Sequence, residues 1–243
     1  MRHQPTPPAS VSAQIRAQRT TGRPRDRVQP GADIEEPVGL PGTGAAARLF
    51  RQFLESARSE NDGLYTAYVL LLVLGLRKGE LLGLTWEMVS LDGAKLYVGE
   101  QLQRVGRQLL RRPTKTEGSE APLPLPDLCV TALKLRRQQQ DTDREHAGDH
   151  WADTGLVFTT RFGTPIEPRN FTRSFDRRIG KAKVRRITVH GTRHWCGSLL
   201  AALDVHPRVA MQILRHSKIA ITMEIYTEVV PSATREALRK LGD

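Results

Sequence analysis

Hydrophobic positions recur at helical spacing along most of the chain from residue 46 onward. The segment Leu64–Leu74 is apolar on nearly all sides, which is typical of a helix buried in the middle of a domain, and Gly75 ends it. A preceding helix over Ala46–Ala57 is predicted from four inward-facing positions, Leu49, Phe50, Phe53 and Leu54.

Further helices are predicted by the same periodicity, and by proline or serine near several of their starts. Within Pro168–Ala182, Phe171 and Phe175 are expected to point inward and the arginines outward. The predicted ranges are Arg77–Leu84, Pro126–His146, Pro168–Ala182, Thr192–Leu203, Pro207–Leu214, Ser217–Tyr226 and Ala233–Leu241.

Short stretches with turn residues between them predict strands in the middle of the chain. The alternation of proline and leucine in Ala121–Leu125 fits an edge strand, and the polar segment Thr114–Glu120 before it is predicted to be a hairpin tip. The other strand candidates are Lys95–Val98, Gln101–Arg104, Gln108–Arg111 and a small hairpin over Leu156–Ile166. We therefore predict an α+β, mainly α-helical fold with one small antiparallel β-sheet.

Residues 1–45 have a different composition. They contain seven prolines, several glycines and almost no apolar run. Such a segment cannot bury enough apolar surface to offset the entropy lost on ordering. We predict a disordered Pro/Gly/Arg-rich segment over residues 1–45 and one folded domain over residues 46–243.

Composition narrows the class of protein. The chain has 243 residues, of which 39% are hydrophobic, enough for one sizeable core. The longest apolar stretch, Ala67–Leu76, is half the length of ~20 residues that a membrane span needs, and the polar N-terminus predicts no secretory signal. Cys129 and Cys196 cannot form a disulfide framework or a CxxC zinc site, so a reduced, cytoplasmic location is expected.

The chain is strongly basic. Its formal net charge is +11, and residues 1–45 hold only six basic against four acidic groups, so most of the excess lies on the part expected to fold. Nucleic acid is the default partner for such a surface. The alternative is that the many arginines only reflect the composition of a GC-rich coding sequence.

One candidate site begins where a long apolar run ends at Arg77. A guanidinium inside a domain must be paired, and Glu80, three residues later, can hold it on the same helical face. One interpretation is an internal Arg–Glu brace. The other is a guanidinium presented as a bidentate fork to a phosphate or carboxylate.

Two more polar clusters follow. In His190–His194 the two histidines share a helix face, but the glutamate of an HExxH zinc site is missing, so no metal site is expected there. Arg193, in apolar surroundings, again requires an anion. Arg215–Ser217 precedes Tyr226, and a tyrosine at a helix end is most often a packed aromatic with a satisfied hydroxyl.

Together these residue types could attack a phosphodiester. Guanidiniums neutralise the oxygens of a pentavalent phosphorus, and an imidazole can take the proton of the nucleophile. A tyrosine hydroxyl can form a covalent ester that conserves the bond energy for rejoining. Composition does not show that the groups meet in space.

The stretches that carry these groups resemble the catalytic domain of the tyrosine recombinase (phage integrase) family. They are most similar to the integrases of phages and mobile elements in high-GC bacteria, that is, actinobacterial phage-type integrases. The resemblance covers about Ala46–Lys240. It is carried by four motifs in the family's order: Leu74–Leu84, Thr114–Thr116, His190–His194 and His216–Tyr226.

The resemblance implies a site-specific recombinase that cuts and rejoins DNA through a 3′-phosphotyrosyl intermediate. Tyr226 would be the nucleophile. Arg77 and Arg193 would clamp the scissile phosphate, and Lys115 would be the general acid for the 5′-hydroxyl. The remaining implied roles are general base or proton shuttle for His190, a phosphate hydrogen bond for His216, and orientation of the site for Glu80.

The resemblance also implies partners. The family uses no metal, ATP or other cofactor, and no membrane partner is expected. It binds double-stranded DNA as a tetramer, so Ala233–Leu241 would dock into a neighbouring protomer, unless it folds back in cis. Binding to the DNA backbone, which should weaken with salt, would use the basic helix face of Arg169, Arg173, Arg177 and Arg178.

Several features depart from the family pattern. Gly191 and Thr192 replace the usual Asp-Leu, Trp195 is bulkier than expected, and Arg215 stands where most members have glycine. The charge of Arg215 would perturb phosphate binding or be harmless on a turn. Residues 1–45 are not expected to form the family's N-terminal core-binding domain. Two alternatives therefore stay open: a weak or inactive DNA-binding integrase remnant, and nicking like that of type IB topoisomerases.

Overall fold

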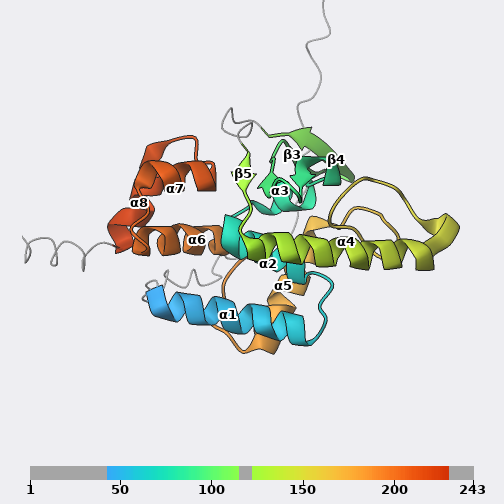
Figure 1. The fold of residues 1–243 in the computed structure, drawn as a ribbon, viewed down its shortest axis with the longest axis horizontal. Coiled ribbons are helices and arrows are strands. Elements are labelled where there is room, and N and C mark those ends of the chain that lie inside the picture. The colour runs from blue at the N-terminus through green and yellow to red at the C-terminus, as the bar shows by residue number, and fades with distance from the viewer. Residues whose placement is uncertain (1–42, 115–121, 230–243) are drawn as a thin grey trace, which may run out of the picture. The chain divides into compact units, whose positions relative to one another are not determined.

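The computed structural model describes residues 43–114 and 122–229. The predicted disordered segment up to residue 42, Lys115 and the predicted final helix lie outside the described residues. The elements are α1 (Thr43–Ser59), α2 (Tyr65–Leu74), α3 (Lys78–Leu82), η1 (Trp86–Met88), β1 (Val89–Ser90), β2 (Lys95–Leu96), β3 (Glu100–Val105), β4 (Gln108–Pro113), β5 (Leu123–Pro124), α4 (Asp127–Ala147), η3 (Gly148–His150), α5 (Pro168–Ala182), α6 (Gly191–Ala202), α7 (Pro207–Leu214) and α8 (Ile219–Val229) (Figure 1).

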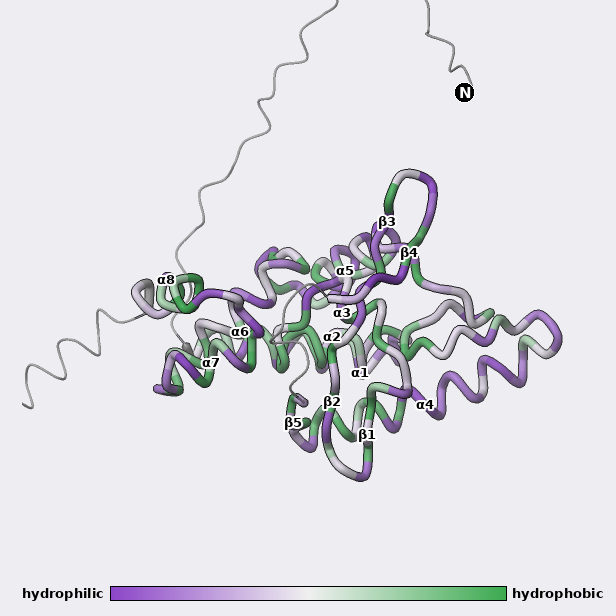
Figure 2. Tube along the Cα trace, turned by 90° about the horizontal axis from the view of Figure 1, so that it is seen from above, coloured by the Kyte–Doolittle hydropathy of each residue, from purple (hydrophilic) through white to green (hydrophobic). Residues whose placement is uncertain are grey.

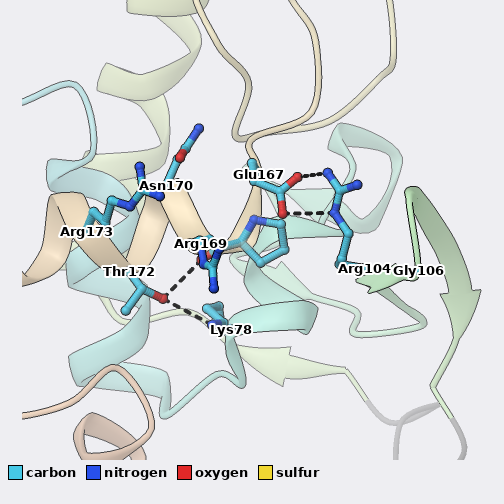
Figure 3. Close-up of a pocket in the computed structure, with 9 residues that line it drawn as sticks. Lys78, Arg104, Gly106, Glu167, Arg169, Asn170, Thr172 and Arg173 are labelled. Atoms are coloured by element: carbon cyan, nitrogen blue, oxygen red, sulfur yellow. Dashed lines mark hydrogen bonds and ion pairs between the residues drawn. The ribbon is translucent and has the colours of Figure 1, made fainter. Parts of the chain in front are cut away.

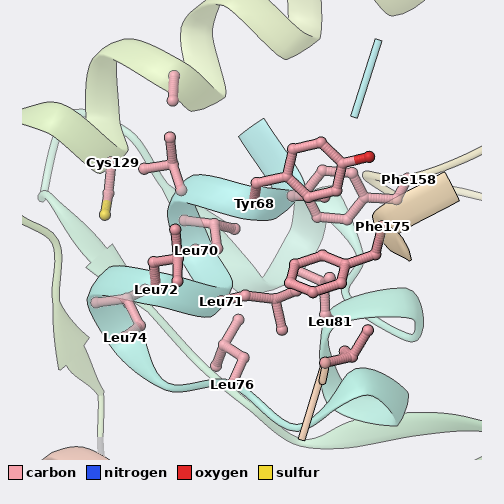
Figure 4. Packing of buried hydrophobic residues seen from close by; sticks show 14 of the residues in the cluster. Tyr68, Leu70, Leu71, Leu72, Leu74, Leu76, Leu81, Cys129, Phe158 and Phe175 are labelled. Carbon is pink, nitrogen blue, oxygen red and sulfur yellow. The ribbon is translucent and has the colours of Figure 1, made fainter. Parts of the chain in front are cut away.

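Helix α2 is the centre of the hydrophobic core. Every residue from Ala67 to Leu72 is at most 2% exposed, which explains why no polar face is visible in this segment. Tyr68 lies 5.2 Å from Phe53 of α1 and 5.8 Å from Phe175 of α5, measured between ring centroids. Figure 4 shows Tyr68 and Phe175 within this core. The predicted central buried helix is confirmed.

Helices α1, α3, α4 and α6 contact α2. Helix α4 packs against it from one side and α6 from another, while α1 contacts α2, α5 and α6 (Figure 1). The C-terminal half of α4 is largely hydrophilic (Figure 2). Among the helices that the structure describes, none has the length and apolar character of a membrane span.

The strands form two small sheets where one was predicted. β1, β2 and β5 make an antiparallel sheet in which β5 is an edge strand, as expected, pairing Leu123 with Leu96. β3 and β4 form a separate hairpin that pairs only with itself, turning at Gly106 in a left-handed conformation. The described strands before and after residues 115–121, β4 and β5, belong to different sheets. The predicted hairpin tip at Thr114–Glu120 lies, apart from Thr114, outside the described residues.

One predicted orientation in α5 is also wrong. Phe171 and Phe175 point inward as expected, but Arg178 is only 5% exposed. Its Nε donates to Asp62 Oδ2 at 2.8 Å, and its Nη1 lies 3.0 Å from Glu60 Oε1. Residue 178 follows Phe175 by three positions and therefore shares its inward face. Its charge is satisfied within the protein, and Arg178 is excluded from the DNA-binding set.

Helices α6, α7 and α8 form the C-terminal part of the described chain (Figure 1). Cys196 of α6, Leu214 of α7 and Ile225 of α8 make a small second hydrophobic cluster. Gly197 of α6 allows this close packing, since a Cβ there would lie 2.8 Å from the Ile225 side chain. These contacts fix the turn that carries His216 and the helix that carries Tyr226.

Candidate active site

The first arginine sits in a sharp turn between two helices. Gly75, with φ of 57°, ends α2 in a left-handed conformation, and Arg77 is extended just before α3. This geometry is accessible to glycine without the steric cost that a side chain would bring. The turn directs the backbone of Arg77 to the start of a short helix whose third residue is Glu80.

Glu80 braces Arg77 in two ways. Its Oε2 accepts a hydrogen bond from the Arg77 backbone N–H at 2.8 Å, and its Oε1 is 2.6 Å from Arg77 Nη1. The Glu80 side chain is 4% exposed, whereas that of Arg77 is 41% exposed. The brace inferred from the sequence is therefore present, and the guanidinium it holds is still accessible.

Arg193 is held on the first turns of α6. Its Nη1 donates to the Gly75 carbonyl at 2.7 Å and its Nη2 donates to the Leu214 carbonyl. It is 5% exposed, and burial together with the charges of Arg77 and Arg215 lowers its pKa to about 9. The guanidinium thus joins the ends of α2 and α7, and no carboxylate of the described residues forms an ion pair with it.

Arg77 and Arg193 line the same cavity. It has a volume of about 290 Å³, and His190, which is exposed at the start of α6, lies at its wall. The structure thus brings together three of the predicted catalytic residues. The full lining is Leu76, Arg77, Lys78, Thr172, Thr188, Val189, His190 and Arg193.

Arg215 is a third guanidinium in this site, and its role was not visible in the sequence. Its Nη2 donates to Glu80 Oε2 at 2.7 Å, and its side chain is 2% exposed. Burial acts to raise the pKa of Glu80, but the charge of Arg215 and the hydrogen bonds from Arg77 outweigh it, so this pKa lies below its usual value. Within the described part of this site, three guanidiniums therefore lie near one carboxylate, Glu80, and an anion would balance their charge.

His216 follows Arg215 and is held by α8. Its Nδ1 is 2.9 Å from Thr222 Oγ1, and the residue is 9% exposed. Burial, then the nearby charges of Arg193, Arg77 and Arg215, lowers its pKa to about 4. His216 is therefore a neutral imidazole at physiological pH, with one ring nitrogen committed to Thr222.

Tyr226 is placed differently from the arginines. It is 8% exposed on α8, and its hydroxyl donates a hydrogen bond to the backbone carbonyl of Val205. Burial, with a smaller effect of Asp204, raises its pKa. Neither Tyr226 nor His216 is among the residues that line the cavity of Arg77. Among the predicted catalytic residues that the structure describes, Arg77, His190 and Arg193 share one cavity, whereas Tyr226 and His216 lie outside its lining.

Lys115 lies outside the described residues, but its neighbour Thr114 is described. The Thr114 backbone N–H donates to the Gly99 carbonyl at 2.9 Å, and its hydroxyl donates to the Val98 carbonyl at 3.2 Å. These contacts attach the chain before Lys115 to residues 98–99, immediately before β3. They do not test the role of Lys115 itself.

A wider basic cavity lies beside the first one (Figure 3). It has a volume of about 960 Å³ and includes the exposed Arg169 and Arg173 of α5 and Lys78, which also lines the smaller cavity. Lys78 Nζ donates to Thr172 Oγ1 at 3.1 Å, while Arg104 of β3 is paired with Glu167. Thr172 and Thr188 are cavity residues outside the four sequence motifs, and Lys78, within the first motif, was not among the predicted site residues.

The histidines of α6 do not form part of a metal cluster. Within residues 43–114 and 122–229, no group of three or more His, Cys, Asp or Glu side chains is placed to hold a metal ion. His190 lies at the cavity, whereas His194 is on the next turn of α6 and is half-buried.

Comparison with known proteins finds related recombinases. An integrase of Streptomyces ambofaciens is 32% identical over 203 residues, covering 80% of this chain and 52% of that protein. A "Tyrosine recombinase XerC-like" protein of Caldanaerobacter subterraneus subsp. tengcongensis is 29% identical over 181 residues, covering 70% of this chain and 46% of that protein. The chain thus spans about half the length of these curated relatives.

Solved structures show the same fold. The Tn1549 transposon integrase in complex with transposon right end DNA aligns with a TM-score of 0.67 and 25% identity, covering 87% of this chain and 68% of that one. The predicted fold of a tyrosine recombinase catalytic domain is confirmed. A model described as the phage integrase family matches residues 48–232, most of the chain. The chain therefore belongs to the phage integrase family of tyrosine recombinases.

Proposed function

We propose that this protein cuts and rejoins double-stranded DNA as a site-specific recombinase, through a covalent link to Tyr226. The proposal rests on the three guanidiniums that lie near Glu80, those of Arg77, Arg193 and Arg215. Arg77 and Arg193 line a cavity together with His190. A DNA phosphate placed there would supply the missing negative charge. The guanidiniums would stabilise the added charge of the pentavalent transition state.

The proposed reaction exchanges one phosphoester for another. The Tyr226 oxygen attacks the phosphorus and loses its proton to a base such as His190, and the bond to the 5′ oxygen breaks. Lys115 gives its proton to that leaving oxygen, in agreement with its position in the family motif. The number of phosphoester bonds is unchanged, so rejoining can proceed by the reverse steps.

Tyr226 must leave Val205 before it can attack. A single hydrogen bond contributes only about 1 kcal/mol net, so exchanging the Val205 carbonyl for a hydrogen-bonding partner at the phosphate carries a small cost. The raised pKa of the hydroxyl keeps it protonated until a base acts. The bond to Val205 is therefore compatible with Tyr226 as nucleophile.

The proposed partner is DNA. The relatives include integrases solved in complex with DNA, and the exposed Arg169, Arg173 and Arg177 on α5 provide a basic surface for phosphates. We place strand exchange in a tetramer on DNA, with Ala233–Leu241 docking into a neighbouring protomer, and in the cytoplasm, where such DNA is found. The family match and the retained site residues support this enzyme over an inactive DNA-binding remnant.

A nicked suicide DNA substrate tests the proposal. The wild-type protein is expected to become covalently attached to the DNA, while Tyr226→Phe still shifts the DNA in a gel but forms no adduct. Tyr97→Phe, at an exposed tyrosine, is the matched control and should react like the wild type. Equal trapping by Tyr226→Phe would reject Tyr226 as the nucleophile. Exchange of strands between two labelled duplexes would separate recombination from simple nicking and relaxation.

A further inference from the structure

Arg215 adopts a backbone conformation that glycine adopts more readily. It caps the C-terminus of α7 with φ of 51° and ψ of 48°, in the left-handed region. Its backbone N–H donates to the Gln212 carbonyl, and the His216 N–H donates to the Met211 carbonyl, both at 3.1 Å. A side chain is unfavourable here, so an arginine at this position needs a compensating interaction.

The compensating interactions come from the buried guanidinium. Nη2 of Arg215 donates to Glu80 Oε2 at 2.7 Å, and Nη1 donates to the Ile213 carbonyl at 3.0 Å. Nε is buried and has no hydrogen-bond partner. The side chain is therefore directed at Glu80 and is shielded from solvent.

The same turn receives hydrogen bonds from the two other arginines. Arg193 donates to the carbonyl of Leu214, and Arg77 Nη2 lies 3.4 Å from the carbonyl of Arg215. Arg77 is in turn bound to Glu80 through its backbone and its guanidinium. The turn before His216 thus connects to both arginines of the cavity, and the Arg215–Glu80 ion pair closes this network.

We propose that Arg215 is a positioning residue: through Glu80 it fixes the Arg77 guanidinium and the turn carrying His216 in one arrangement. This inference rests on the proposed function, because the arrangement matters for attack on a phosphate. Arg215 receives a hydrogen bond from the cavity residue Arg77 at its backbone carbonyl, while its guanidinium is directed at Glu80. Its influence on the reaction passes through Glu80, whose Oε2 it shares with the Arg77 backbone N–H, while Oε1 holds the Arg77 guanidinium.

Arg215→Gly tests this role without straining the backbone. The variant should bind DNA within about two-fold of wild type, and at saturating DNA its rate of covalent trapping should fall at least about ten-fold, because one of the two cations holding Glu80 is gone. Arg215→Lys, which keeps the charge but not the fork, should recover part of the lost rate. Lys183→Gly is the matched control, since Lys183 is an exposed basic cap of α5 with the same left-handed backbone.

A double-variant cycle with Glu80→Gln identifies the route. If Arg215 acts through Glu80, the double variant should cleave no more slowly than the slower single variant. Multiplied losses, or an Arg215→Gly rate within two-fold of wild type, would overturn the inference. Failure of the wild type to form any adduct would instead reject the proposed function. If the wild type forms no adduct, the melting temperatures of the same four proteins still test the coupling between Arg215 and Glu80. Additive changes in melting temperature would overturn this coupling, and non-additive changes would support it.

Discussion

The Tyr226 hydroxyl donates its hydrogen bond to the Val205 carbonyl, in the turn that joins α6 to α7. Asp204, next to that carbonyl, is the second cause of the raised pKa of Tyr226, after burial. Burial first, and Asp204 second, therefore keep the hydroxyl of the proposed nucleophile protonated, and the segment of Asp204 also holds it in place.

Asp204→Asn should lower the pKa of Tyr226, because it removes the negative charge but leaves a residue that tolerates the left-handed backbone at this position. The ionisation can be followed by ultraviolet absorbance as the difference between each protein and its Tyr226→Phe counterpart. Glu224→Gln, at an exposed position on α8, should leave the pKa of Tyr226 unchanged. An unchanged pKa in Asp204→Asn would show that burial alone raises it.

Arg77→Lys should reduce cleavage far more than DNA affinity. Lysine keeps the positive charge but cannot bind Glu80 and a phosphate together with a planar fork. We expect a loss of about 100-fold or more in single-turnover cleavage, with affinity changed only a few-fold. A cleavage rate within a few-fold of wild type would contradict the assignment of Arg77 to the phosphate.

Lys115→Ala should abolish cleavage of ordinary DNA and retain cleavage of DNA with sulfur in place of the bridging 5′ oxygen. A thiolate leaves without a proton, so a lost general acid becomes dispensable. Rates on the two substrates, compared between variant and wild type, measure this directly. If sulfur restores no activity to the variant, Lys115 has another role.

His216 should make folding stability depend on pH in mildly acidic solution. Its pKa is about 4 in the folded protein against an ordinary 6.5, so the unfolded chain binds more protons between these values. The contribution is fully present above about pH 6.5 and is lost as the pH falls toward 4, by up to roughly 3 kcal/mol. Denaturant unfolding of wild type and His216→Gln across this range should show a steeper loss of stability in the wild type, and the difference between the two curves measures the contribution of His216.

Substitutions of two arginines of α5 should have opposite effects on stability and on DNA binding. Arg178→Ala should destabilise the fold by about 3 kcal/mol, because Asp62, only 17% exposed, would lose its partner. Arg173→Ala, at an exposed position lining the basic cavity, should leave stability unchanged but weaken DNA binding and reduce its salt dependence. Unfolding curves and binding isotherms at several salt concentrations distinguish the two effects.

Local sequence patterns predict most of the helices and strands. They do not predict contacts between residues that lie far apart in the sequence. The buried run of α2 and the inward Phe171 and Phe175 follow from periodicity alone. The charge of Arg178 predicts a position on the surface, although its spacing from Phe175 places its side chain on the buried face of α5. The partner of Arg215 is Glu80, 135 positions away, and no local pattern could reveal that pair. The same holds for the contact between Tyr226 and the Val205 backbone.

Gly75 sets a limit on which sequences can maintain this site. A Cβ at this position would lie 2.8 Å from the Leu214 side chain and 3.4 Å from Cys196, while the Gly75 carbonyl itself receives Arg193. Any larger residue would push α7 away from α2 and so separate the Gly75 and Leu214 carbonyls to which Arg193 donates. Random mutagenesis should therefore find inactivating changes at Gly75 as often as at the charged residues, although Gly75 takes no chemical part in the reaction.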